Sequence, residues 1–119
     1  MTRARVLFGV LVAVQLAVLY WPRTVGNPDG VPVDKLVHAL VFGLVAWSGV
    51  RAGVPAVWLV AVLIGHAVLS EVIQANLLPH RSGDPWDAVA DTIGTLVGAF
   101  VGVRDRRRAM MRTMWGTAR

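Results

Sequence analysis

The side chains of this chain that could bind a polar ligand, hold a cation or move a proton gather at a few places along the sequence. Carboxylates and imidazole ligate divalent ions and act as general bases, while lysine and arginine suit phosphate. Such a density of polar groups is unexpected between long apolar runs. We predict one outward-facing polar site, formed by Asp34, Lys35, His38, Glu71, Gln74, Arg81, Asp87 and Asp91.

The elements that would position these residues are membrane-spanning helices. The 119-residue chain is 55% hydrophobic and 16% charged, with a mean hydropathy of +0.59, whereas a water-soluble domain carries about a quarter charged residues. Only helices fit this pattern, because lipid offers the backbone no hydrogen-bond partners. The lack of cysteine excludes disulfides, thiolate catalysis and cysteine-type zinc sites.

Four apolar segments predict an all-α fold, a polytopic four-helix transmembrane bundle that forms a single domain over residues 1–119. The spans are expected at about residues 6–21, 34–50, 55–78 and 86–103. Their short connections make neighbouring helices antiparallel. The first span has no clear cleavage site at its end, so we interpret it as a retained helix that also serves as the export signal.

The distribution of basic residues predicts the orientation in the membrane. One side holds Arg3, Arg5, Arg51 and a basic tail at residues 104–119, and the other holds Arg23, Lys35 and Arg81. The positive-inside rule therefore places both termini in the cytoplasm. The net charge of +5 comes from the tail, which we expect to lie along the membrane surface as a helix. We predict no nucleic-acid partner, because no recognition motif accompanies the arginines.

Helical spacing brings the candidate residues to a similar depth and onto shared faces. The pairs Asp34 with His38 and Asp87 with Asp91 are i and i+4, and the pair Glu71 with Gln74 is i and i+3. At about 1.5 Å per residue, Glu71 lies roughly 10 Å from the outer end of its span. Ionisable groups at that depth turn towards the bundle interior or a water-filled cavity. We therefore expect one crevice that opens outward.

Each candidate also has a purely structural interpretation. The alternatives are a helix N-cap for Asp34, an interfacial histidine for His38, an ion pair with Arg81 for Glu71 and a dipole-stabilised first-turn acid for Asp87. The depth of Asp91 does not fit the last of these accounts. His66, in the middle of its span, is expected to make an interhelical hydrogen bond rather than to bind a ligand.

Glycines recur at every fourth position of the last span, at Gly94, Gly98 and Gly102. Glycines with this period let another helix backbone approach closely, and such packing holds helices together where lipid removes the hydrophobic driving force. Gly94 nearly shares a face with Asp87, so close packing there would hold the Asp87 and Asp91 carboxylates in place. A homo-oligomer is left open.

The order of these residues resembles that of the VanZ-like membrane proteins. The pattern spans about residues 33–102 and reads Asp34-Lys35-x-x-His38, Glu71-x-x-Gln74, Arg81, Asp87, then a helix with Gly94 and Gly98. In that family the last helix usually has Asn where Asp91 stands here. The resemblance implies a small protein of the bacterial plasma (inner) membrane and cell envelope. The founding member is associated with resistance to the glycopeptide teicoplanin, and the resemblance leaves that link open for this chain.

Three hypotheses for function follow. The favoured one is binding or remodelling of a lipid-linked or cell-wall-related polar ligand, such as a lipid-linked cell-wall precursor. The alternative is a metal-assisted hydrolase or transferase, with a divalent ion held by His38, Glu71, Asp87 and Asp91, although no HExxH or GxSxG motif is present. The third is transport of a small ion or proton. We assign no catalytic residue, cofactor or metal site, and membrane lipid is the expected partner.

Overall fold

The computed structural model describes residues 2–21, 32–79 and 83–116, and these residues form four helices. The helices are α1 (Thr2–Tyr20), α2 (Val33–Arg51), α3 (Ala56–Leu77) and α4 (Pro85–Gly116). Each is long and apolar enough to cross a membrane. The predicted all-α fold is therefore confirmed, and the chain is a four-helix, multi-pass membrane protein in contact with lipid.

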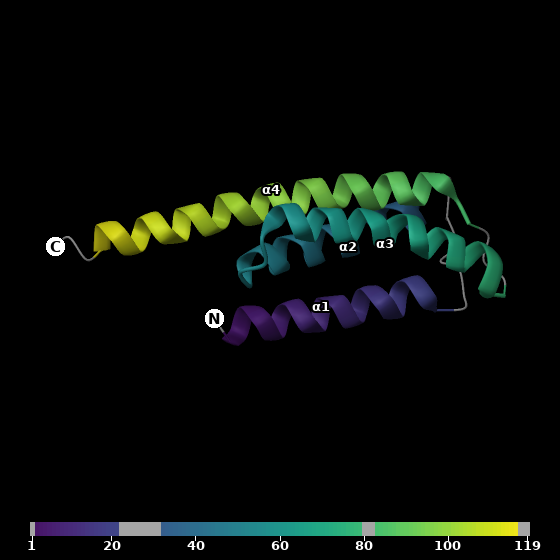
Figure 1. Ribbon diagram of the computed structural model, residues 1–119, viewed down its shortest axis with the longest axis horizontal. Coiled ribbons are helices and arrows are strands. Elements are labelled where there is room, and N and C mark those ends of the chain that lie inside the picture. Colours follow the sequence, from purple (N-terminus) through teal and green to yellow (C-terminus); the bar gives the residue numbers. More distant parts are fainter. Residues whose placement is uncertain (1, 22–31, 80–82, 117–119) are drawn as a thin grey trace.

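Successive helices run antiparallel (Figure 1). Charged residues of opposite sign gather at the two ends of the bundle, which therefore differ chemically. The end of α1, the start of α2, the end of α3 and the start of α4 lie together at what we call the acidic end, which carries Asp34, Glu71, Asp84, Asp87 and Asp91. The opposite, basic end carries Arg3, Arg5, Arg51 and the arginines of α4. The basic residues named here thus gather at one end of the bundle, as the positive-inside rule requires. Which end faces the cytoplasm stays a prediction.

Helix α4 does not stop near residue 103, where the last membrane span is expected to end, and that boundary of the span stays a prediction. Helix α4 continues without a break to Gly116, over 32 residues, and is thus about 48 Å long. After Pro85 it contains no proline, and its final third is rich in arginine and methionine, which favour helix. The tail therefore extends α4 in line, beyond the ends of the other helices (Figure 1). Its position along the membrane surface stays a prediction.

A polar contact ties this extension to α2 at the basic end. The indole Nε1 of Trp47 donates a hydrogen bond of 3.0 Å to Oδ2 of Asp105. The Arg51 guanidinium lies 5.0 Å from the centre of the Trp47 ring, in a cation–π arrangement. The first turn beyond residue 103 is thereby anchored to the bundle.

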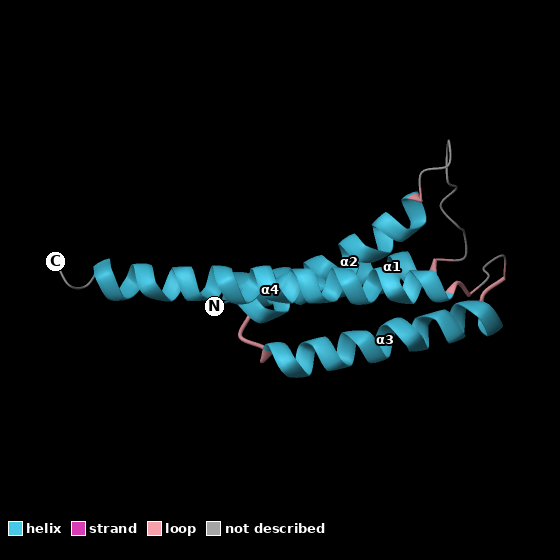
Figure 2. Cartoon of the chain, turned by 90° about the horizontal axis from the view of Figure 1, so that it is seen from above, coloured by secondary structure: helices cyan, strands magenta, loops and turns pink. Residues whose placement is uncertain are grey.

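Helices α2 and α4 pack against each other more extensively than any other pair; they run in the same direction (Figure 1), and α2 is tilted across α4 (Figure 2). At Gly94, the Cβ atom that any other residue carries would overlap the carbonyl oxygen of Ala39, and at Gly98 it would overlap that of Gly43. The obstructing atoms belong to backbone, which cannot move aside. The glycine face of α4 therefore fits onto the backbone of α2, the partner that the sequence did not specify.

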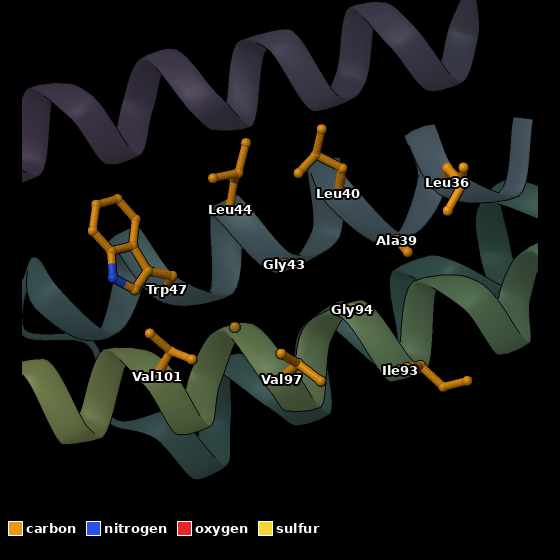
Figure 3. A pocket seen from close by; sticks show the side chains of 11 residues that line it. Leu36, Ala39, Leu40, Gly43, Leu44, Trp47, Ile93, Gly94, Val97 and Val101 are labelled. Carbon is orange, nitrogen blue, oxygen red and sulfur yellow. The ribbon is translucent and has the colours of Figure 1, made fainter. Parts of the chain in front are cut away.

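The lipid-facing side of this contact is an apolar groove of about 460 Å³ (Figure 3). Ala39, Gly43 and Gly94 carry little or no side chain where the two ribbons approach, while Leu36 and Ile93 lie at its end nearer the acidic end (Figure 3). All of its lining residues are apolar apart from the Trp47 indole nitrogen. The contact between α2 and α4 is thus a match of shapes and involves no buried charge along the groove.

Helix α1 joins the bundle through few residues, of which Gln15 and Leu19 are buried. The Tyr20 hydroxyl lies 3.0 Å from Nε2 of His66 in α3, so the prediction of an interhelical hydrogen bond at His66 is confirmed. The Gln74 amide donates a bond of 3.1 Å to the carbonyl oxygen of Leu19. Gln74 therefore satisfies a carbonyl at the end of α1, where the helix itself supplies no donor.

Replacing either packing glycine should destabilise the bundle. Gly94→Ala and Gly98→Ala should each lower the free energy of unfolding by about 1–3 kcal/mol, the range for an overpacked core site, because the added methyl group meets backbone. Gly65→Ala is the matched control, since no described atom lies within 4 Å of the site of its Cβ. There the change should raise stability by about 0.5–1 kcal/mol. Unfolding of the purified variants in mixed micelles measures both effects, and equal behaviour of the three variants would contradict this packing.

Candidate functional site

His38 and Asp91 form the buried centre of the acidic end. His38 is 1% exposed and Asp91 is fully buried. The ring Nδ1 of His38 lies 2.9 Å from Oδ1 of Asp91. A carboxylate can only accept, so Nδ1 carries the hydrogen and donates it. This burial excludes the interpretation of His38 as an interfacial helix-end histidine.

The other ring nitrogen of His38 faces two further carboxylates. Its Nε2 lies 4.0 Å from Oδ1 of Asp34 and 3.9 Å from Oδ2 of Asp87. These separations are too long for hydrogen bonds, and Nε2 has no hydrogen-bond partner among the described residues. Asp34 lies in the first turn of α2, whose N-cap is Pro32 with no side-chain capping bond, so the N-cap interpretation of Asp34 is wrong.

Lys35 holds the outer edge of the site by bridging two aspartates. Its Nζ donates to Oδ2 of Asp84 at 2.7 Å and to Oδ1 of Asp87 at 3.1 Å. Asp84 is also the N-cap of α4, since its Oδ1 accepts the Trp86 N–H at 2.9 Å and Pro85 occupies the first helical position. The Lys35 ammonium, aided by the Trp86 N–H, lowers the pKa of the Asp84 carboxyl below its ordinary value.

Glu71 connects α3 to the same site. Its Oε2 accepts the backbone N–H of Asp84 at 2.8 Å. Gly83 permits this approach, because a Cβ there would lie 2.8 Å from Cβ of Ala75 and 2.9 Å from the Glu71 carbonyl oxygen. The suggested ion pair of Glu71 with Arg81 involves a residue outside the described part of the chain. The described partner of Glu71 is instead the backbone at the start of α4.

Two buried carboxylate oxygens in this site lack partners. Oε1 of Glu71 and Oδ2 of Asp91 make no hydrogen bond to the described residues. One ligand-capable atom from each of His38, Glu71 and Asp91 lies within 4.8 Å of the other two. Leaving ionised carboxylates buried and unpaired is costly. The arrangement therefore favours something positive between them, either a cation or a proton.

The charge balance points the same way. The described residues of the acidic end contain five carboxyl groups and one amine, the latter on Lys35. That amine is already engaged by Asp84 and Asp87. Lysine suits phosphate, as noted from the sequence, but the described partners of Lys35 are two aspartates. The described side chains thus form an acidic site with little capacity left for an anion.

A groove of about 400 Å³ reaches Glu71 from the side of the bundle, between the end of α3 and the start of α4. Its walls are mostly apolar and are formed by Val68, Val72, Ala75, Asn76, Gly83, Pro85 and Ala88. Since α3 and α4 both span the membrane, this groove opens towards acyl chains. A molecule with an apolar part and a polar part could lie in it with the polar part at Glu71.

The structure thus brings most of the predicted residues together but not all of them. Six of the eight lie at the acidic end, whereas Gln74 turns away to the end of α1 and Arg81 lies outside the described residues. Their role as ligand-binding residues stays a prediction. Asp84 was not among the predicted site residues, although its place beside Pro85 at a helix start is a recognisable N-cap signal.

Two further buried polar residues were also missed. Thr95 is fully buried and Gln15 is 2% exposed, and each has a side-chain atom without a partner among the described residues. Thr95 continues the spacing of four that relates Asp87 to Asp91, so its position on the same face of α4 could have been found. Gln15 is a lone amide in the apolar run of α1, which by itself indicates an inward-facing position.

Comparison with family models, with curated proteins and with solved structures finds no match for this chain. The site is therefore interpreted from its own geometry and chemistry.

Replacing the Asp84 carboxylate should change how stability depends on pH. Asp84→Asn retains an oxygen for the Trp86 N–H but removes the charge that faces Lys35. Because the folded-state pKa of Asp84 is lowered, the charge stabilises the fold fully above the unfolded pKa of about 3.9. The stability advantage of the wild type should be lost as the pH falls through the lowered pKa. Unfolding of both proteins across pH tests this, and a difference independent of pH would contradict the ion pair.

Proposed function

We propose that this membrane protein binds a lipid-linked polar ligand of the bacterial cell envelope. The polar part would lie at the acidic end, and the apolar part would lie in the groove between α3 and α4. The observation that carries the proposal is the position of Glu71, which belongs both to the buried polar site and to the lining of the lateral groove. One residue thus joins a surface suited to acyl or polyprenyl chains to a surface suited to a headgroup.

The charges indicate which headgroups would fit. Lys35 is occupied by two aspartates, and one oxygen each of Glu71 and Asp91 has no hydrogen-bond partner among the described residues. Headgroups rich in hydroxyl, amide or amine donors, as in sugars and peptides, satisfy such acceptors directly. A phosphate group would need an added positive charge. A sugar or peptide attached to a lipid carrier is therefore the favoured ligand class, and the resemblance to VanZ-like proteins is in keeping with it.

Binding is favoured over ion transport because the polar groups stop within the bundle. His66, near the middle of α3, is engaged by Tyr20. Between it and the basic end, the described core consists mainly of apolar residues, among them Val45, Val50, Leu59 and Leu63. A pathway for protons or ions needs polar groups or water along its length. The arrangement of polar groups is therefore better suited to holding a ligand at the acidic end than to conducting ions across the bundle.

Filling the lateral groove should block capture of the ligand. Ala75→Trp adds a large side chain to the groove wall, whereas Val62→Trp adds the same group to a lipid-facing position of α3 that is 65% exposed and outside the groove. The probe is a photoreactive polyprenyl-linked disaccharide in proteoliposomes. We expect Ala75→Trp to reduce labelling about tenfold or more, equivalent to at least about 1.4 kcal/mol, and Val62→Trp to leave it unchanged.

The location of the label provides a second criterion. Digestion should place it on peptides from the end of α3 or the start of α4, and excess unlabelled precursor should displace it. Labelling of the wild type no stronger than that by a photoreactive phospholipid would contradict the proposal. Equal labelling of the two tryptophan variants would contradict it as well.

A further inference from the structure

We propose that Asp34, His38 and Asp87 form a binding site for one divalent metal ion of the Zn²⁺ or Mn²⁺ class, and that Asp91 orients the imidazole ligand. These three side chains come from α2 and α4, where the two helices begin. One ligand-capable atom from each lies within 4.8 Å of the other two. The inference concerns a cation and needs no lipid ligand, so it goes beyond the proposed function.

The tautomer of His38 makes Nε2 the ring nitrogen that can bind a metal. Because Nδ1 donates to the Asp91 carboxylate at 2.9 Å, the neutral ring keeps its lone pair on Nε2. Histidines that ligate metals in proteins usually donate their second ring N–H to a carboxylate in this way, which fixes the ring and strengthens the ligand. The fully buried Asp91 thus holds the His38 ring so that Nε2 points away from Asp91. Nε2 faces Asp34 and Asp87 instead.

The Nε2 atom of His38 is buried and faces two carboxylates. His38 is 1% exposed, and its Nε2 has no hydrogen-bond partner among the described residues. A buried ring nitrogen without a partner is costly. Two carboxylate oxygens face it, Oδ1 of Asp34 at 4.0 Å and Oδ2 of Asp87 at 3.9 Å. Direct hydrogen bonds are ruled out by these distances, and an ion between the three atoms would satisfy all of them.

The distances themselves suit a metal. Zinc is bound by histidine nitrogen and carboxylate oxygen at about 2.0–2.2 Å, so two ligands of one ion lie at most about 4.3 Å apart. The separations of 3.9 and 4.0 Å from Nε2 fall inside that limit. The two aspartate oxygens lie within 4.8 Å of each other. A nitrogen and two carboxylate oxygens suit Zn²⁺ or Mn²⁺ better than Mg²⁺ or Ca²⁺, which prefer oxygen alone.

The charges around the site and its exposure at Asp34 also favour a divalent cation. The site lies among five carboxyl groups and one lysine, so a divalent cation lowers the repulsion between them. Lys35 contacts the Oδ1 atom of Asp87, whereas the Oδ2 atom of Asp87 faces the His38 ring. The side chain of Asp34 is 22% exposed, against 1% for His38 and 4% for Asp87. An ion could therefore enter from the surface of the acidic end past Asp34 and become enclosed.

The test is metal binding by the full-length protein in detergent, after removal of metals with a chelator. Titration with Zn²⁺ and with Mn²⁺ against a competing chromogenic chelator gives affinity and stoichiometry. We expect one ion per chain and binding weakened at least about 100-fold in His38→Gln. In Asp91→Asn, which changes only the group behind the imidazole, we expect a loss of about 10–100-fold.

Matched controls separate this site from other histidines and carboxylates. His66→Gln and Asp105→Asn remove groups that lie elsewhere in the bundle, and both should retain wild-type affinity. Asp34→Asn guards against a folding artefact, because its partly exposed side chain can be changed while the buried residues stay intact, and it should still lose affinity. Helical circular dichroism and gel filtration verify that each variant is folded.

The outcomes are decisive in either direction. Absence of saturable Zn²⁺ or Mn²⁺ binding by the wild type would overturn the proposal. Wild-type affinity in both Asp34→Asn and His38→Gln would overturn it as well and would assign any binding to other residues. Because no lipid is present, failure here leaves the lipid-capture experiment untouched, and a failure of lipid capture leaves this result unaffected.

Discussion

The close, parallel contact between α2 and α4 is the constraint on which the rest of the structure depends. Gly94 and Gly98 lie against the backbone at Ala39 and Gly43, so a step of four along α4 matches a step of four along α2. About one turn nearer the acidic end, the same close contact brings Asp91 against His38. The polar site is therefore a consequence of backbone packing, and its precision comes from glycines that have no side chains of their own to contribute.

The energetic logic of the site differs from that of the surrounding bundle. Elsewhere, apolar side chains face lipid or one another, and helices are held by shape. At the acidic end, carboxylates are buried with too few positive partners among the described residues, which is unfavourable in the absence of a ligand. Intramembrane acids are usually kept for function. Lipid capture and metal binding both relieve this imbalance, the first through donor groups and the second through charge, and a bound cation would also let the site accept a phosphate.

Much of this could be predicted from sequence, because hydropathy reports helices directly. The four spans, the segregation of acidic and basic residues, and the interhelical role of His66 all follow from composition and spacing. The glycine repeat predicts a close-packing face but not its partner, since the pattern is the same for α1, α2, α3 or a second chain. The dual contact of Lys35 and the turn of Gln74 towards α1 depend on tertiary placement. The unbroken continuation of α4 to Gly116 was not predicted, because the apolar run that marks the span ends near residue 103.

The most direct test of this account is the distance between the His38 ring and the Asp91 carboxyl group in lipid bilayers. Solid-state NMR of protein labelled with ¹⁵N in histidine and ¹³C in aspartate measures it through the dipolar coupling between the two groups. The account predicts a strong coupling from a protonated Nδ1, in keeping with the hydrogen bond of 2.9 Å. The coupling should be lost in Asp91→Asn, because this variant has no labelled aspartate carboxyl group at position 91. A His38 ring with no coupling to any aspartate carboxyl would contradict the register of α2 on α4 and the site built on it.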